Sequence, residues 1–539
     1  MIIDLVCLTE TQDLPDWSSG SIWMIGPTPK QIKDCLQINL PTSKADAWLF
    51  WDINLGVPNE QAILQCLNLP GDLWHAGLKL GMNGQPGLID FVQPTWMLNR
   101  DADPNIISTS WRISLRACLV KTEVLRQIGG PDPEFLTLAG AGLDWGLRLL
   151  KAGVIPRYTP YLNSGYTKDG ENLPLSDELR ILYNWTKPFW VKWALMLAIG
   201  HQQITIRQAK QAARSVFSSP RSETPPRYTR VTLPVEIDPS TRVSLIIPTI
   251  QRYPYLRVLL EQLRHQTVAP TEIILIDQTP VIERDLDMVN DFADLPLKVI
   301  YLDKPGQCTA RNIGIKNSSG DYLLFLDDDV EVQPDTIEKH LNTILSFKAE
   351  VSAGTVHEPG EQDLSSRTPV VQVSSVLPTG NVMLKKEVLN KTGLFDLAYD
   401  HGARADGDLG MRLYLKGALI IQNLSNDILH HHAPRGGLRE HRARVITAKQ
   451  SKSSWTKLVT PSVTEYYLAM RYFSEHQVRN LKTILTLAPF RNEKNGITCI
   501  AHLLIRIVQL PSYLIRMKKN VTKARRMLEK FPQIPKLHE

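Results

Sequence analysis

Three adjacent carboxylates, Asp327, Asp328 and Asp329, follow directly after the apolar run at residues 323–326. A short apolar run with polar flanks is typical of a buried strand, and open α/β sheets bind ligands beyond the carboxyl ends of their strands. Mg²⁺ is usually held by one or two carboxylates together with substrate phosphates, and Mn²⁺ accepts similar ligands. The run therefore predicts a metal and diphosphate site at a strand end. The alternative is a solvated acidic turn.

The surrounding segments predict the elements that would position these acids. Residues 243–249 are typical of a strand that ends in a Pro-Thr turn, and residues 272–277 form a second apolar run that ends in an aspartate. Between them, leucines at 256, 259, 260 and 263 recur at helical spacing. This alternation of strand and helix patterns favours an α/β fold.

Residues 242–440 resemble the inverting family 2 glycosyltransferases, which have the nucleotide-diphospho-sugar (GT-A) fold. The acidic run stands at the position of the family's DXD motif. Residues 405–412 (ADGDLGMR) are similar to its acceptor-side ED-x-DL-x-x-R motif, with Ala405 in place of the first acid. The other matching segments, in the family's order, are 243–249, 272–277, 306–314 and 430–437.

The resemblance implies a nucleotide-diphospho-sugar donor and a divalent metal, Mn²⁺ or Mg²⁺. In the family, the aspartate at position 277 recognises the nucleobase, and Arg311 and Asn312 lie in a loop that faces the nucleotide. An arginine fork suits a diphosphate because it bonds two oxygens at once. The implied metal ligands are Asp327, Asp329 and His430. The implied donor-binding residues are Pro248, Thr249, Asp277, Gly306, Arg311, Asn312, Asp327 and Asp328.

The acceptor hydroxyl must lose a proton, and a carboxylate within hydrogen-bond reach can take it. Asp406 matches the second acid of the family motif and is the expected catalytic base. Asp408 is the rival candidate, with a structural role that holds Arg412 as its alternative. His430 could also belong to a plain polar loop.

The chain contains an internal repeat. Residues 121–153 align without a gap to residues 385–417, an offset of 264, and 13 of the 33 positions are identical. Residues 46–54 likewise parallel residues 321–329. The period is far longer than that of solenoid repeats, so we expect two tandem domains of one fold.

The two copies differ where the chemistry is expected. Ile53 and Asn54 stand at the positions of Asp328 and Asp329, and Gly142 stands at the position of Asp406. Asp144, in contrast, retains the position of Asp408. We therefore expect a degenerate GT-A-like domain at 1–215. The alternative is an active domain with an unusual site.

The remaining regions complete the expected organisation. Several prolines between residues 216 and 241 indicate an extended linker, which separates the first domain from the catalytic domain at 242–440. Residues 441–539 are mainly helical in pattern, and an apolar stretch near 503–514 precedes a basic cluster. Such a tail can bind an anionic membrane surface. The alternative is a core-packed helix with a solvated basic end.

Composition sets further limits. The net charge of +6 is mild for 539 residues, so nucleic-acid binding is not indicated. Six scattered cysteines without metal-ligand spacing favour reduced thiols in the cytoplasm. We recognise no signal peptide and no apolar stretch long enough for a transmembrane helix. The expected location is the cytoplasm, with contact to the inner face of the membrane as an option.

The expected activity is metal-dependent transfer of one sugar to a hydroxyl of a glycan or lipid-linked acceptor. Inversion is expected because one base and no covalent nucleophile are evident. Two alternatives stay open: a nucleotidyltransferase, which would have no use for Asp406, and a catalytically inactive glycan-binding protein.

Overall fold

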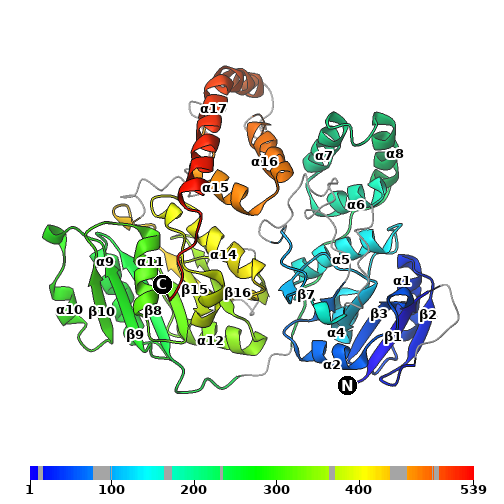
Figure 1. Ribbon diagram of the computed structural model, residues 1–539, viewed down its shortest axis with the longest axis horizontal. Coiled ribbons are helices and arrows are strands. Elements are labelled where there is room, and N and C mark those ends of the chain that lie inside the picture. The colour runs from blue at the N-terminus through cyan, green and yellow to red at the C-terminus, as the bar shows by residue number, and fades with distance from the viewer. Residues whose placement is uncertain are drawn as a thin grey trace.

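The computed structural model describes residues 1–9, 16–76, 98, 100–162, 173–230, 235–362, 371–374, 376–437, 458–487, 490 and 497–538. Two mixed β-sheets with flanking helices lie side by side, and each half carries a helical extension on the same side of the molecule (Figure 1). The predicted α/β class, with tandem domains and a helical C-terminal region, is confirmed.

The second sheet contains the predicted site strands. Its order is β10-β9-β8-β11-β15-β13-β16-β12, and β14 pairs with β16. Strands β8, β9 and β11 are parallel neighbours, so their carboxyl ends meet at one edge of the sheet. The strands are β8 (Val243–Thr249), β9 (Glu272–Asp277), β10 (Leu297–Tyr301), β11 (Tyr322–Leu326), β12 (Val330–Glu331), β13 (Val351–His357), β14 (Val371–Val373), β15 (Asn381–Lys385) and β16 (Ile420–His430).

Helices pack on both sides of this sheet. Helix α9 (Tyr253–Arg264) buries the four leucines that predicted it. Helix α11 (Gln307–Asn317) packs against β8 and β9, so Arg311 and Asn312 lie in a helix and not in the expected loop. The other helices of this half are α10 (Asp287–Asp291), α12 (Thr336–Phe347), α13 (Leu389–Thr392) and α14 (Ala405–Leu415).

The first sheet has the order β2-β1-β3-β6-β4-β7-β5. Its central strands β1 and β3 are fully buried, which agrees with their nearly continuous apolar sequences. The strands are β1 (Ile3–Leu8), β2 (Ile22–Ile25), β3 (Ala47–Asp52), β4 (Leu73–His75), β5 (Ser108–Thr109), β6 (Ala117–Lys121) and β7 (Pro156–Tyr158). The helices are α1 (Pro29–Asn39), α2 (Glu60–Asn68), α4 (Thr122–Ile128) and α5 (Leu138–Ala152).

The sequence repeat is also a repeat of topology. The series β2-β1-β3-β6-β4-β7 matches β9-β8-β11-β15-β13-β16 in order and in the direction of every pairing. The register also agrees, because Lys121 lies opposite Ala47 in the first sheet and Lys385 lies opposite Tyr322 in the second.

Two helical groups extend from the sheets (Figure 1). The first contains α6 (Leu175–Trp185), α7 (Pro188–Gly200) and α8 (Ile206–Phe217), so the first half reaches slightly beyond residue 215. The second contains α15 (Val463–Tyr472), α16 (Glu475–Leu487) and α17 (Ile497–Lys530). In the described part of the chain, no helix combines the length and apolar character needed to span a bilayer.

The linker and the two halves are packed together. Described residues between α8 and β8 form no helix or strand, as predicted, but Arg230 of this segment pairs with Asp72 at 2.5 Å. Across the interface the Tyr414 hydroxyl donates to the Arg100 carbonyl at 2.6 Å, and Arg157 donates to the carbonyl of Gly417 at 3.2 Å. One buried apolar cluster runs through both halves.

Candidate active site

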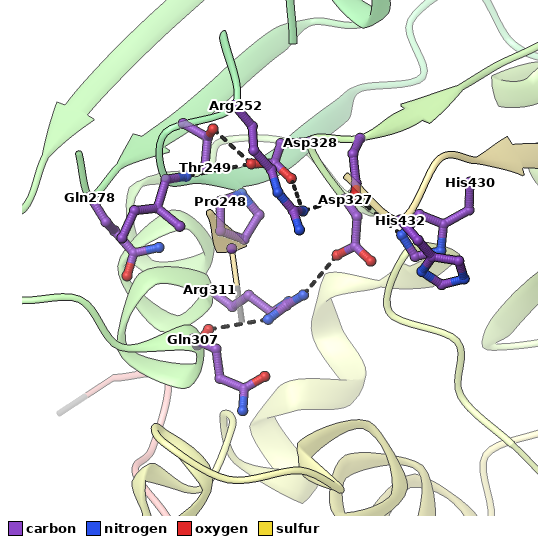
Figure 2. A pocket seen from close by; sticks show the side chains of 13 residues that line it. Pro248, Thr249, Arg252, Gln278, Gln307, Arg311, Asp327, Asp328, His430 and His432 are labelled. Carbon is purple, nitrogen blue, oxygen red and sulfur yellow. Dashed lines mark hydrogen bonds and ion pairs between the residues drawn. The ribbon is translucent and has the colours of Figure 1, made fainter. Parts of the chain in front are cut away.

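A polar pocket lies at the carboxyl ends of β8 and β11, where the acidic run was expected to create one (Figure 2). Its free space of about 100 Å³ is smaller than the roughly 300 to 1,000 Å³ of typical ligand pockets. The pocket is open to solvent, so part of a larger ligand could lie outside this space. The lining residues are Pro248, Thr249, Ile250, Arg252, Gln278, Gln307, Arg311, Asp327, Asp328, Asp329, His430, His432 and Gly437.

Asp328 is buried and held by protein groups. Its Oδ2 accepts from the Thr249 hydroxyl at 2.8 Å, and its Oδ1 accepts from Arg252 Nη1 at 2.7 Å. Burial raises the pKa of Asp328 to about 6, although the positive charge of Arg252 opposes this shift. The carboxylate thus fixes the β8 turn and Arg252 and has little capacity left for a ligand.

Asp329 and His430 form the second buried pair of the pocket. His430 ends β16, and its Nε2 lies 3.2 Å from Asp329 Oδ1. Asp329 Oδ2 accepts from the backbone N–H of Ala433 at 2.7 Å. Burial would raise the pKa of Asp329, but the hydrogen bond from His430 and the charge of Arg252 lower it to about 2. Asp329 is therefore an anion at neutral pH.

Arg252 is the functional candidate that sequence reasoning missed. It directly precedes α9, and its Nη1 lies 2.7 Å from Asp328 and 2.9 Å from Asp329 (Figure 2). The side chain is only 11% exposed, so its charge offsets both carboxylates with little screening. The only sequence signal was an arginine three residues after the Pro-Thr turn.

Asp327 is the acid of the run with most contact to solvent, because its side chain is 32% exposed. Its Oδ1 accepts from Arg311 Nη2 at 3.1 Å. Arg311 reaches the pocket from the first turns of α11, with its guanidinium near the ring of Phe395. These two side chains offer a carboxylate and a fork of donors to the open part of the pocket.

Three predicted donor residues do not line the pocket. The Asn312 amide donates to the Phe395 carbonyl and accepts from the Phe395 N–H, so it braces α11. Asp277 accepts from the Tyr253 hydroxyl at 2.7 Å, and its neighbour Gln278 reaches the pocket instead. Gly306 directly precedes α11, and an added Cβ there would lie 2.8 Å from the Asp400 side chain, so this glycine is packed against Asp400.

The two aspartates of α14 occupy different environments. Asp406 is half-buried in the first turn, and burial raises its pKa despite the nearby charges of Arg404 and Arg311. Asp408 is fully buried, where its Oδ2 accepts two bonds from Arg412 and its Oδ1 accepts from the Tyr472 hydroxyl. The expected contact with Arg412 is confirmed. Both oxygens of Asp408 accept hydrogen bonds away from solvent, which favours the structural role over the role of a base.

The corresponding places in the first half are filled by protein. Asp52 Oδ1 accepts from the backbone and side chain of Asn54, and Oδ2 accepts from Arg116 at 2.6 Å. At Gly142, the counterpart of Asp406, an added Cβ would lie 2.3 Å from the carbonyl oxygen of Ile113. No side chain fits there without a shift of backbone.

The side chains that could act as metal ligands can be compared with what the implied metal needs. Asp329 and His430 are ligand types that Mn²⁺ accepts, and their 3.2 Å separation is close to the roughly 3 Å between neighbouring ligands of one ion. Within the described residues, no group of three or more His, Cys, Asp or Glu side chains could hold a metal. The pair offers suitable ligand types, but Asp329 Oδ1 also contacts Arg252 Nη1 at 2.9 Å, so an ion completed by substrate phosphates would have to displace Arg252. The predicted trio with Asp327 is not preassembled.

Comparison with known proteins finds a family match within the second half. Residues 244–393 match the family described as Glycosyl transferase family 2. Most residues of the pocket described above lie within this match, while His430, His432 and Gly437 lie beyond it.

Individual relatives cover shorter stretches. The uncharacterized glycosyltransferase YwdF of Bacillus subtilis (strain 168) is 38% identical over 99 residues, which is 18% of this chain and 36% of that protein. Chondroitin synthase of Pasteurella multocida (strain Pm70) is 23% identical over 303 residues, covering 47% and 31%. Among solved structures, S. aureus TarS 1-349 in complex with UDP-GlcNAc covers 54% of this chain and 82% of that chain, with a TM-score of 0.35 and 18% identity. The chain spans about a third of the first relative's length.

Proposed function

We propose that the protein is an inverting glycosyltransferase that moves a sugar from a nucleotide-diphospho-sugar to a hydroxyl of a glycan or lipid-linked acceptor. The observation that carries the proposal is the convergence of Arg311, Asp327 and the Asp329–His430 pair in one pocket of the family 2 domain. Relatives named chondroitin synthase and O-antigen biosynthesis protein RfbC support a role in surface polysaccharide biosynthesis.

In the proposed reaction, the donor diphosphate enters beside Arg311, whose two Nη groups suit neighbouring phosphate oxygens. Asp329 and His430 would hold a divalent metal, Mn²⁺ or Mg²⁺, which as a Lewis acid offsets the charge of the leaving diphosphate. Asp406 accepts the proton of the acceptor hydroxyl, whose oxygen then forms the new bond to the anomeric carbon as the diphosphate departs. A single displacement of this kind inverts the anomeric configuration.

The first half is proposed to be catalytically inactive. The Asp52 carboxylate is fully engaged by Asn54 and Arg116, and the backbone of Ile113 occupies the position where a base would project. Its contacts with the second half fit a brace for the catalytic domain.

The proposed location is the cytoplasm, at the inner face of the membrane. Residues of α17 such as Leu504 and Val508 are 58% and 80% exposed, and the basic cluster follows along the same helix. Exposed apolar residues beside lysines and arginines favour contact with an anionic bilayer.

A donor screen tests the proposal. Purified protein is incubated with UDP-, GDP- and dTDP-sugars and either Mn²⁺ or Mg²⁺, and release of the nucleoside diphosphate is measured. We expect release from one nucleotide class and its loss in EDTA. Full activity in EDTA would show that the reaction does not need a divalent metal. Pyrophosphate release from a nucleoside triphosphate, with no sugar donor consumed, would support a nucleotidyltransferase instead.

A further inference from the structure

A second cavity, separate from the donor pocket, lies between α15, α16 and the start of α14. In Figure 1 these two helices stand directly above α14. The cavity has a free volume of about 240 Å³ and is partly open to solvent. Most of its lining is apolar, and its polar members include Arg404 and Glu465. The other lining residues are Pro461, Tyr466, Leu468, Ala469, Phe473, Gln477, Val478, Leu481 and Leu485.

The cavity lies beside the helix that carries the proposed base. Arg404, which lines the cavity, is the residue immediately before α14, and Asp406 is the second residue of that helix. Arg311, which lines the donor pocket, also acts electrostatically on Asp406, as does Arg404. A molecule seated in the cavity with its polar end at Arg404 would therefore lie beside the first turn of α14, which carries Asp406.

Arg404 can bind an anionic group at the edge of the cavity. Its side chain is 45% exposed, and its partner Glu465, at 2.9 Å, is 32% exposed. An ion pair this exposed contributes little stability and can be exchanged for another anion. The backbone of Arg404 has φ of 83°, a left-handed conformation that costs a non-glycine residue of order 1 kcal/mol and recurs at ligand sites.

Helix α17 packs against α15 beside the cavity and carries exposed apolar residues of its own. The carbonyl of Leu485, a lining residue, accepts from the Tyr513 hydroxyl at 2.7 Å. The next two residues, Leu514 and Ile515, are 41% and 57% exposed, and a basic stretch begins at Arg516. An apolar cavity, an adjoining apolar surface and nearby cations together match an amphiphile with an anionic head.

We propose that this cavity binds the apolar chain of a lipid-linked acceptor, with Arg404 contacting the anionic group that joins chain and sugar. The inference rests on the proposed function and narrows its acceptor from glycan or lipid-linked glycan to the lipid-linked class.

Binding of alkyl phosphates to the full chain tests this without any donor. Titration calorimetry with methyl, butyl, hexyl and octyl phosphate should show affinity rising about threefold to fourfold per added methylene, since each buried CH₂ contributes about 0.8 kcal/mol. Leu481→Trp, which fills the cavity from a half-buried position, should weaken the binding of octyl phosphate at least tenfold. The affinity for methyl phosphate should stay unchanged. Val258→Trp, at an exposed site on α9, is the matched control and should bind like the wild type.

Two further arms keep the test decisive. Ala469→Leu is a smaller filling substitution, and it should also weaken octyl phosphate if Leu481→Trp fails to fold. Arg404→Gln should weaken octyl phosphate but not octyl glucoside, whose head is uncharged. Affinity that does not depend on chain length, or octyl phosphate binding that survives both filling substitutions, would overturn the proposal, and the latter would place the chain on the α17 surface. Donor turnover without alkyl binding would refute this inference alone. Alkyl binding without donor turnover would refute the proposed function, and the cavity would then be a lipid site with no acceptor role.

Discussion

At the scale of single residues, sequence reasoning found the acids and the histidine but not the cation among them. Asp327 to Asp329 were placed correctly because a buried strand leads directly into them. His430 needed a family motif, since it reaches the pocket from a strand about 100 positions away. Arg252 was missed because a long side chain before a helix can point in many directions, and only tertiary packing selects one.

Arg252 should control both stability and metal binding. Arg252→Gln leaves Asp328 and Asp329 as neighbouring buried acids without their cation, so we expect a loss of about 3 to 5 kcal/mol in unfolding free energy. Mn²⁺ should then raise the melting temperature of the variant more than that of the wild type, because a bound cation restores the charge balance. Equal shifts in both proteins, measured by thermal melts with and without Mn²⁺, would contradict this role.

Substitution of the two aspartates of α14 should have different effects, on the transfer rate for Asp406 and on stability for Asp408. Asp406→Asn removes the proton acceptor, and we expect transfer to fall about 10²- to 10⁴-fold with donor affinity unchanged. Asp408→Asn leaves Arg412 buried without its counter-charge, so it should cost about 3 to 5 kcal/mol of stability and little rate per folded molecule. Single-turnover transfer, donor binding and melting temperature are measured for both. Normal transfer in Asp406→Asn would reject it as the base.

The same base predicts how transfer depends on pH. Burial raises the pKa of Asp406, so the rate should be full above this raised pKa and decline as pH falls through it. Because the folded state binds this proton more tightly than the unfolded state does, protonation of Asp406 contributes stability at pH values below the ordinary aspartate pKa. That contribution is lost as the pH rises through the raised pKa of Asp406 in the folded protein. At neutral pH, therefore, the melting temperature of Asp406→Asn should be no lower than that of the wild type. Its residual transfer rate should not decline at low pH as the wild-type rate does.

At the scale of elements, most strands and helices follow from local pattern. Helix α9 was predicted from its leucines, and β8, β9 and β11 from apolar runs. Arg311 and Asn312 were expected in a loop from the family resemblance, and the apolar residues of α11 form no clear stripe that would have predicted a helix instead. Its polar Gln307 and Asn312 are buried through hydrogen bonds to the backbone of residues 395–402. Those contacts come from a distant segment and leave no periodic signal.

Helix α5 offers a test of the inactive first copy. Because a Cβ at Gly142 would lie 2.3 Å from the Ile113 oxygen, Gly142→Ala forces the backbone apart and should cost about 1 to 3 kcal/mol. Gly200→Ala, at the end of α7 with open space around it, is the matched control and should be neutral or slightly stabilising. Chemical denaturation of the full chain measures both. A neutral Gly142→Ala would mean that this helix has room for a side chain where the second copy carries its base.

At the scale of the whole molecule, the repeat was predictable while the contact between its copies was not. An ungapped alignment of 33 residues indicated two related domains, and the strand register agrees with it. The interface depends on single long-range bonds, such as Tyr414 to the Arg100 carbonyl, that no local pattern encodes. The linker was predicted to be extended, but its arginine contacts with the first half could not be foreseen.

These contacts predict that the chain unfolds as one unit and that ligand at one site stabilises all of it. A nucleoside diphosphate with Mn²⁺ at about 100 times its Kd should stabilise the native state by about 2.7 kcal/mol and move a single calorimetric transition upward. Asp327→Ala should abolish this shift, because it removes the exposed carboxylate of the donor pocket. Asp52→Ala, its register counterpart, is the control: it loses the Arg116 pair and some stability but should keep the full ligand shift. Two separate transitions of which only one moves would show that the halves are energetically independent, and a shift lost in Asp52→Ala would place donor binding in the first half as well.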